Sequence, residues 1–297
     1  MHSATFCIFN LQLSAKSTCK KHLGITGSGK SVFARNLIRQ IASDDTKVII
    51  VDLTGEYKTR FDKIESIISD EDSKKSFSAI EILTTEKAKF SHQQDKQKIA
   101  VNEKKIKIAF GSSIKAFLEN EDSIAIFEIP DISNSSDVLE YTRWFFYVLF
   151  KISQKKGNFG KRVCVVLEEA HTIIPEYNSM GVSDFASKAT VNSIAQIALQ
   201  GRKYNIGFIV IAQRTANVSK TVLTQCNSII SFQELDKTSS DFLSNYIGND
   251  FINALSTLKF RTAIAVGKAF RSAVPIIFEV PEIEEEIINP DSTREDI

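Results

Sequence analysis

Residues 24 to 31 read GITGSGKS, which matches the pattern G-x-x-x-x-G-K-[S/T] of a phosphate-binding loop. Glycines allow successive main-chain N–H groups to turn inward and surround an anion. The stretch that follows, VFARNLIRQIA, has apolar residues at helical spacing. A helix that begins there would point its N-terminus at the phosphates, so we expect a nucleoside triphosphate to bind.

Two side chains of this loop have specific tasks in such sites. Lys30 would reach the β- and γ-phosphates, and the Ser31 hydroxyl would ligate Mg²⁺, so ATP and Mg²⁺ are the expected cofactors. The residues before the loop, STCKKHL, are mostly polar, so the strand leading into it is expected to be short and to begin near His22. The predicted nucleotide-binding residues are Gly24, Thr26, Gly27, Ser28, Gly29, Lys30, Ser31 and Val32.

The composition is that of an ordinary soluble globular protein. Of 297 residues, 43% are hydrophobic and 25% are charged, which is enough for a large core. The net charge of +1 gives no basic signature, so any nucleic-acid contact needs a local patch or repeated subunits. The four cysteines form no C-x-x-C pair, which argues against disulfides and structural zinc. No stretch of eighteen apolar residues occurs, so we expect a cytoplasmic protein without a membrane span.

Apolar runs bounded by turn residues alternate with helical patterns along the chain. This alternation predicts an α/β fold with a mostly parallel sheet flanked by helices, and near-continuous apolar runs are typical of strands covered on both faces. Helices are predicted at about 32–42, 136–155, 184–200 and 238–258. Strands are predicted at 48–52, 79–83, 124–129, 163–167, 208–212, 228–232, 262–266 and 274–278.

The chain divides into three parts by composition. Residues 1–19 are a short N-terminal segment, 20–281 form the predicted ATPase domain, and 282–297 are an acidic tail. Within the domain, residues 84–107 are polar and rich in lysine. A solvated helix or surface insertion is the favoured interpretation of that stretch, and a DNA-facing loop is the alternative.

An acidic pair, Glu168 and Glu169, ends the apolar run VCVVL. In a chain with a phosphate loop, one such carboxylate holds Mg²⁺ and the other polarises the attacking water as general base. We assign Glu168 to the metal and Glu169 to the base. The alternative is two exposed glutamates that open a helix and complement its dipole. For His171, a structural role is favoured over one beside the site.

Three further residues are candidates for the site. Gln213 follows the strand GFIVIA, where its amide could bond the γ-phosphate or the water as a sensor. Asp52 ends a strand expected beside the phosphate loop, so its carboxylate should face the nucleotide. Arg202 in GRKYN could stabilise the phosphoryl group, although a surface salt bridge is an equal alternative for it and for Arg214.

The order of these pieces resembles a known family. HLGITGSGKS, VDLTGEY, VVLEEAHTIIP and GRKYNIGFIVIAQRT resemble the HerA-like ATPases, in the FtsK–HerA branch of RecA-like P-loop NTPases, from about His22 to about Val280. The resemblance implies a homo-hexameric ring that hydrolyses ATP between subunits and moves double-stranded DNA. It also implies a NurA-like nuclease or a defence effector as partner. Carried over, Glu168 and Glu169 match the acidic pair, Gln213 the sensor, and Arg202 a finger acting on the neighbour's ATP.

Three features depart from the family pattern. Only about twenty residues precede the loop, so the family's N-terminal β-barrel is not expected in this sequence. His22-Leu23-Gly24-Ile25 joins Thr26 directly, which looks like a deletion of three residues. Leu199 and Gln200 stand where the family usually has Arg-Glu.

These features leave several functions open. The leading hypothesis is a DNA-translocating ATPase of HerA type in DNA end processing or antiphage defence. A conjugation or secretion ATPase is the first alternative, and a degenerate nucleotide-binding switch with little hydrolysis is the second. A small-molecule kinase fits the phosphate loop, but such kinases rarely need a Glu-Glu pair followed by a glutamine-tipped strand.

Overall fold

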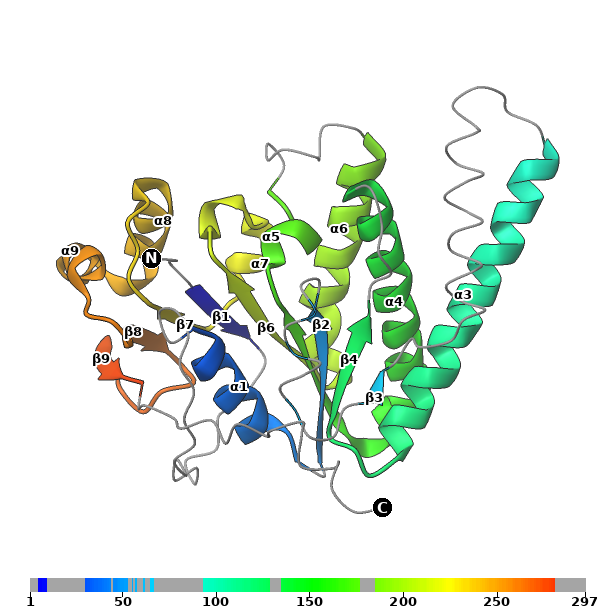
Figure 1. Ribbon diagram of the computed structural model, residues 1–297, viewed down its shortest axis with the longest axis horizontal. Helices are drawn as coiled ribbons and strands as arrows, with labels where there is room; N and C mark the ends of the chain where they lie inside the picture. Colours follow the sequence, from blue (N-terminus) through cyan, green and yellow to red (C-terminus); the bar gives the residue numbers. More distant parts are fainter. Residues whose placement is uncertain are drawn as a thin grey trace, which may run out of the picture.

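The computed structural model describes residues 5–9, 30–43, 45–52, 55, 57, 61, 65–66, 93–128, 135–176 and 185–280. A nine-stranded sheet in the order β3-β4-β2-β5-β6-β1-β7-β8-β9 crosses the molecule (Figure 1). The strands are β1 Thr5–Phe9, β2 Thr46–Asp52, β3 Glu65–Ser66, β4 Ile124–Glu128, β5 Arg162–Leu167, β6 Ile206–Ala212, β7 Ser228–Ser231, β8 Thr262–Gly267 and β9 Ile276–Glu279. The α-helices are α1 Lys30–Ile41, α3 Gln93–Glu119, α4 Ser135–Lys156, α5 Ala170–Ile173, α6 Phe185–Gln200, α7 Lys220–Leu223, α8 Lys237–Ile247 and α9 Asn249–Thr257.

The sheet has a parallel half and an antiparallel half. Strands β3, β4, β2, β5 and β6 pair in parallel, and helices α3, α4 and α6 connect them along the chain. From β6 onward, the pairings with β1, β7, β8 and β9 are antiparallel. The predicted α/β fold is confirmed, and the parallel pairing holds for the half that carries the acidic pair.

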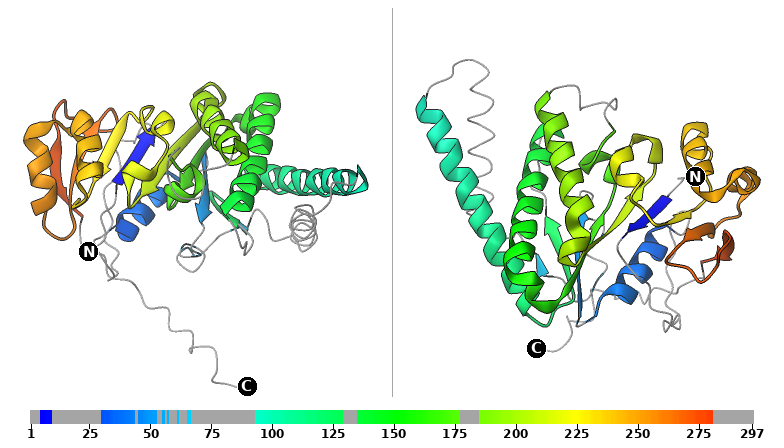
Figure 2. Two further views of the ribbon diagram at one scale, coloured as in Figure 1. Left: turned by 90° about the horizontal axis from the view of Figure 1, so that it is seen from above. Right: turned by 180° about the vertical axis from the view of Figure 1, so that it is seen from behind.

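Both faces of the sheet are covered, as the apolar strands predicted. Alternate residues of β2 enter different cores: Ile49 and Val51 pack with α4 and α6, whereas Val48 and Ile50 pack with α1. Helix α1 therefore lies on the opposite face from α4 and α6, as Figure 2 shows. All of these β2 side chains are fully buried.

Most predicted elements lie within a few residues of their observed bounds. The strand predicted at 79–83 and the short strand near His22 lie outside the described residues. The helix predicted at 238–258 is two helices, because Gly248 takes a φ of 88° and ends α8 before α9 begins. Strand β1 was not predicted, and it lies inside the sheet between β6 and β7, although it belongs to the stretch expected as an N-terminal segment.

Helix α3 extends beyond the body of the molecule (Figures 1 and 2). Its 27 residues span about 40 Å at 1.5 Å per residue. Toward its C-terminus, Phe110 and Phe117 are fully buried, whereas Lys96, Lys98 and Lys104 nearer the N-terminus are exposed. The described part of the lysine-rich stretch thus belongs to a helix with exposed lysines, and residues 84–92 lie outside the described residues.

The C-terminal end of α3 is held by a buried lysine. Lys47, 1% exposed on β2, donates from Nζ to the carbonyl oxygens of Asn120 and Asp122, the first at 2.7 Å. Its ammonium also lies 5.3 Å from the centroid of the Phe117 ring. The positive charge of Lys47 is therefore paired with carbonyl oxygens just after the helix. A positive charge at this place also interacts favourably with the negative, C-terminal end of the helix dipole.

Lys47→Met keeps the apolar stem and removes these bonds. We expect the free energy of unfolding to fall by about 1–3 kcal/mol, because buried carbonyl oxygens lose their donor. Chemical denaturation measures the change. Lys115→Met, on an exposed position of α3, is the control and should stay within about 0.5 kcal/mol of the parent. Equal stability of the two variants would contradict the role given to Lys47.

Candidate active site

The candidate residues gather at the carboxyl ends of three neighbouring parallel strands. Asp52 ends β2, Glu168 and Glu169 follow β5, and Gln213 follows β6. Since β2, β5 and β6 run parallel and adjacent, these ends lie along one edge of the sheet. Ligands of open α/β sheets bind at this edge. Helix α1 presents Lys30, its first residue, to the same place.

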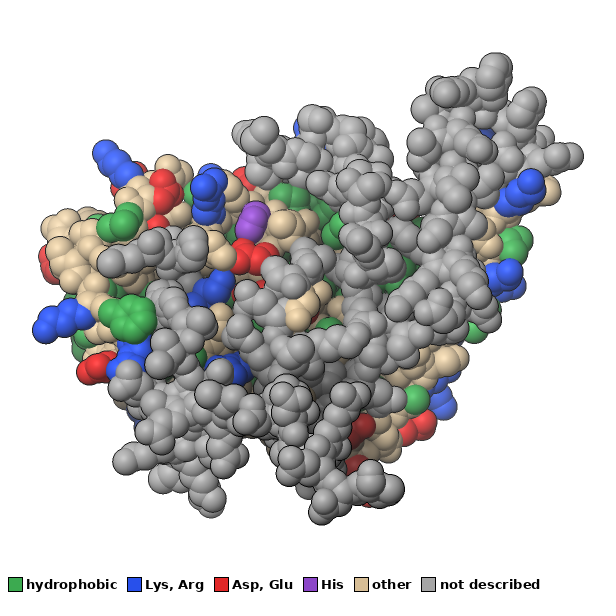
Figure 3. All heavy atoms as spheres, in the orientation of Figure 1, with side chains coloured by type: hydrophobic (Ala, Val, Ile, Leu, Met, Phe, Trp, Pro, Cys, Tyr) green, Lys and Arg blue, Asp and Glu red, His purple; other side chains and the backbone are tan. Residues whose placement is uncertain are grey.

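Lys30 lies between the two glutamates. Its Nζ is 3.4 Å from Glu168 Oε1 and 3.3 Å from Glu169 Oε1. The amide Nε2 of Gln213 donates to the same Glu169 oxygen. Four residues predicted for the site are thus joined by contacts through Lys30 and Glu169. In Figure 3, acidic, basic and histidine side chains gather near the middle of one face of the molecule.

Glu169 occupies an unusual backbone conformation. Its φ of 46° and ψ of 50° are left-handed, which costs a non-glycine residue of order 1 kcal/mol or more and is concentrated at functional sites. The turn places Glu169 Oε2 3.3 Å from Nδ1 of His171. His171 therefore lies against the predicted base, rather than having only the structural role that the sequence favoured.

Asp52 organises the turn that follows β2. Its Oδ1 accepts from the main-chain N–H of Gly55 at 3.0 Å, and its Oδ2 accepts from that of Tyr57 at 2.9 Å. Gly55 has a φ of 70°, a conformation that glycine adopts at little cost. These bonds give Asp52 a structural task, and its contact with a nucleotide stays a prediction.

Tyr57 is a site residue that sequence reasoning missed. Its side chain is buried, and its hydroxyl donates to Glu168 Oε2 at 2.9 Å. The two residues are 111 positions apart, so no local pattern reveals the contact. The available signal was the turn TGEY directly after a buried strand at the predicted ligand edge.

The two glutamates have different environments. Burial raises the pKa of Glu168 to about 7, against the opposing effects of the Lys30 charge and the Tyr57 hydrogen bond. Burial also acts to raise the pKa of Glu169, but the close approach of His171 Nδ1 and the charge of Lys30 outweigh it, so this pKa lies below its usual value. Glu169 is therefore ionised at neutral pH, whereas Glu168 holds a proton for part of the time.

This difference predicts a pH-dependent effect of Glu168→Gln. The pKa of Glu168 is about 7 in the folded protein and near 4.5 in the unfolded chain. Between these values the folded state holds a proton that the unfolded state has lost, so the stability contributed by Glu168 falls as pH rises. The melting temperature of Glu168→Gln relative to the parent should therefore rise from pH 5 to pH 8.

Glu140→Gln removes a carboxylate that is paired with Arg143 and more than a third exposed, and it serves as the control. Its melting temperature relative to the parent should differ by the same amount at both pH values. A melting-temperature difference between Glu168→Gln and the parent that stays constant with pH would contradict the raised pKa of Glu168.

The residues present fit a magnesium–nucleotide site. Among the described residues, no group of three or more His, Cys, Asp or Glu side chains could enclose a metal. Mg²⁺ commonly takes one or two protein ligands together with phosphates and water. The buried carboxylate of Glu168 and the hydroxyl of Ser31, one residue after Lys30 on α1, are of the chemical type that would serve as such ligands. Val32 is buried, and the loop residues Gly24, Thr26, Gly27, Ser28 and Gly29 lie outside the described residues.

Arg202 is not part of this cluster. It is exposed in the turn Gly201–Tyr204, which precedes β6, whereas Gln213 follows the other end of that strand. Seven residues of strand separate the two ends by about 20 Å. Arg202 therefore cannot reach the cluster of its own subunit.

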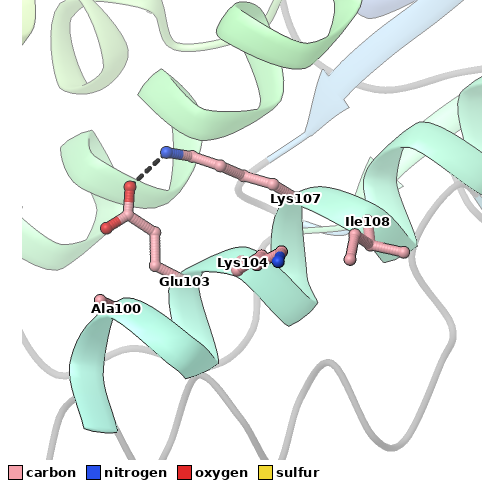
Figure 4. A pocket seen from close by; sticks show the side chains of 5 residues that line it. All are labelled: Ala100, Glu103, Lys104, Lys107 and Ile108. Carbon is pink, nitrogen blue, oxygen red and sulfur yellow. Dashed lines mark hydrogen bonds and ion pairs between the residues drawn. The ribbon is translucent and has the colours of Figure 1, made fainter. Parts of the chain in front are cut away.

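A cavity of about 400 Å³ lies away from this site, along α3. The described residues of its lining all lie on this helix, where Lys107 pairs with Glu103 (Figure 4). The Lys107 ammonium also lies 5.9 Å from the centroid of the Trp144 ring and 5.2 Å from that of Tyr147. These contacts account for the lysine in structural terms. The lining residues are Ala100, Glu103, Lys104, Lys107 and Ile108.

Among the described helices, none is both long and apolar enough to cross a membrane.

Comparison with known proteins agrees with the geometry. The DNA double-strand break repair helicase HerA of Sulfurisphaera tokodaii is 26% identical over 150 residues, covering 47% of this chain and 28% of that protein. A probable helicase of Methanocaldococcus jannaschii is 23% identical, covering 87% of this chain and 66% of that protein. The chain thus spans less than two thirds of the length of these relatives.

A solved structure has a similar fold. The genome packaging NTPase B204 from Sulfolobus turreted icosahedral virus 2, in complex with ATP-gammaS, aligns with a TM-score of 0.51 at 15% identity. The alignment covers 88% of this chain and 94% of B204. Residues 9–250 match the family described as "Helicase HerA, central domain", and the chain therefore belongs to that family, within the FtsK–HerA group of P-loop NTPases.

Proposed function

We propose that this chain is the ATP-hydrolysing subunit of a HerA-type motor that moves along double-stranded DNA. The observation that carries the proposal is the contact of Lys30 with Glu168 and Glu169, and of Glu169 with Gln213, at the carboxyl edge of the parallel strands. Phosphate-binding lysine, acidic pair and sensor amide are the parts that phosphoanhydride hydrolysis requires.

Each residue takes one task in the proposed reaction. Lys30 exchanges its carboxylate partners for the β- and γ-phosphates when ATP binds. Glu168 and Ser31 would hold Mg²⁺, and the ion would supply positive charge to neutralise the charge that develops on the phosphate oxygens. Glu169 accepts a proton from the attacking water, because its lowered pKa leaves it ionised at neutral pH. Gln213, already bonded to Glu169, orients that water.

The relatives supply the proposed substrate. Those of Sulfurisphaera tokodaii and Saccharolobus solfataricus are described as DNA double-strand break repair helicases. The exposed lysines of α3, such as Lys96, Lys104 and Lys105, are candidates for contacts with the DNA backbone. One chain has a net charge of only +1, so it cannot build a strong positive field by itself. We therefore propose a ring of copies, a hexamer, in which the lysines of several chains surround the DNA. Phosphate contacts would make binding salt-dependent and nearly independent of sequence.

Arg202 is proposed to act in trans. It is exposed at the opposite end of β6 from the acidic pair, so only a neighbouring subunit could bring it to a phosphate. An arginine supplied in this way stabilises charge on the transferring phosphoryl group. We also propose that a nuclease or defence effector acts together with the motor. The proposed location is the cytoplasm.

ATP hydrolysis, measured with and without linear duplex DNA, tests the proposal directly. The parent should turn over ATP faster with DNA. Lys30→Ala should lose nucleotide binding and turnover, and Glu169→Gln should keep binding but lose turnover by about a hundredfold or more. Glu140→Gln is the control and should match the parent. Nucleotide binding without turnover in the parent would instead favour a nucleotide-binding switch.

The role of Arg202 has a complementation test. Arg202→Ala should lower turnover by about a thousandfold without weakening nucleotide binding, and Lys203→Ala, beside it in the same exposed turn, should not. Mixing Arg202→Ala with Glu169→Gln subunits should restore part of the activity, because some interfaces then combine an intact Arg202 with an intact Glu169. A mixture as inactive as its components would exclude action in trans.

A further inference from the structure

The buried contact between Tyr57 and Glu168 has no role in the reaction as described so far. Tyr57 is 2% exposed and Glu168 is 5% exposed. The Tyr57 hydroxyl donates to Glu168 Oε2 at 2.9 Å, and Glu168 Oε1 faces Lys30 at 3.4 Å. The two oxygens of one carboxylate therefore have separate partners, one on each side.

Tyr57 is held through both its main chain and its ring. Its main-chain N–H is bonded to Asp52 Oδ2 at the end of β2. Its ring stacks on that of Phe61, with centroids 6.1 Å apart and planes 14° from parallel. The guanidinium of Arg39, in the last turn of α1, lies 5.4 Å from the centroid of the Phe61 ring. Tyr57 is thus held by the strand next to β5 and, through Phe61, by the helix that begins with Lys30.

A carboxylate at the end of a side chain can rotate unless a donor fixes it. Glu168 is proposed to bind Mg²⁺ and must present a defined oxygen toward the phosphate-binding helix. A hydrogen bond to the other oxygen supplies that orientation, and partners of metal ligands commonly act in this way. Tyrosine suits the task, because its hydroxyl donates a hydrogen bond and its ring is rigid and packed in place.

We propose that Tyr57 is a positioning residue for Glu168: its hydroxyl holds one carboxylate oxygen so that the other faces Lys30 and the phosphate-binding helix. The inference rests on the proposed function, because the orientation matters only where Glu168 binds Mg²⁺ with a nucleotide. Asp52 then has an indirect part, since it holds the turn that carries Tyr57.

Tyr57→Phe removes the hydroxyl and keeps the ring, its stacking on Phe61 and its main-chain bond. The measurement is binding of a fluorescent ATP analogue as Mg²⁺ is titrated, which needs no turnover. The Mg²⁺ concentration for half-saturation should rise about tenfold. Binding in EDTA should be unchanged within about twofold, since the nucleotide itself is not contacted. Tyr147→Phe, which removes a hydroxyl from an exposed ring on α4, is the matched control and should match the parent.

A second arm separates positioning from general structure. In a Glu168→Gln background, adding Tyr57→Phe should change the Mg²⁺ requirement by less than about twofold, because the carboxylate through which Tyr57 acts is already absent. A tenfold effect that persists in that background would overturn the inference. If the parent responds to Mg²⁺ and Tyr57→Phe needs the same Mg²⁺ concentration for half-saturation, the inference about Tyr57 is overturned and the proposed function is not. A parent whose nucleotide binding does not respond to Mg²⁺ would overturn the proposed function and the inference with it.

Discussion

One ammonium group shared by two carboxylates is the interaction on which the site depends. Lys30 comes from the first residue of α1, and Glu168 and Glu169 come from the turn after β5. Neither glutamate could be buried here as an ion without a positive partner, because removing an unpaired charge from water costs several kcal/mol. The pairing therefore fixes the start of α1 against the end of β5. It also keeps the acidic pair at the place where phosphates would replace it as partners of Lys30.

The architecture of the sheet explains why this pairing forms at one edge. Helical connections make β2, β5 and β6 parallel, so their carboxyl ends coincide and the polar residues that follow them meet. Their interiors are buried on both faces, which leaves the strand ends as the place for polar groups. The antiparallel half, from β1 to β9, has no such common edge. Polar chemistry and parallel pairing thus occupy the same half of the molecule.

The sequence was sufficient for the parts of the site that follow a buried strand. Glu168, Glu169 and Gln213 each stand directly after an apolar run, so the rule about strand ends located them. Tyr57 could not be found in this way, because its partner lies 111 residues away and its position depends on a turn closed by Asp52. Strand β1 could not be predicted, because five residues beside a polar stretch show no clear hydrophobic periodicity. Gly248 broke a helix whose apolar pattern continues on both sides of it.

The environments of the two glutamates support the different tasks that we propose for them. Glu168 is the more buried, and its carboxylate is bonded by Tyr57 and faced by Lys30, which suits a group that must be fixed and that binds a cation once deprotonated. Glu169 is less buried, lies in a strained turn, and has Lys30 and His171 against it, which keep it ionised. Exchanging the two tasks would require the more buried carboxylate to act on water and the less buried one to bind the metal. Of these two adjacent glutamates only Glu169 has a left-handed backbone, a conformation that is concentrated at functional sites.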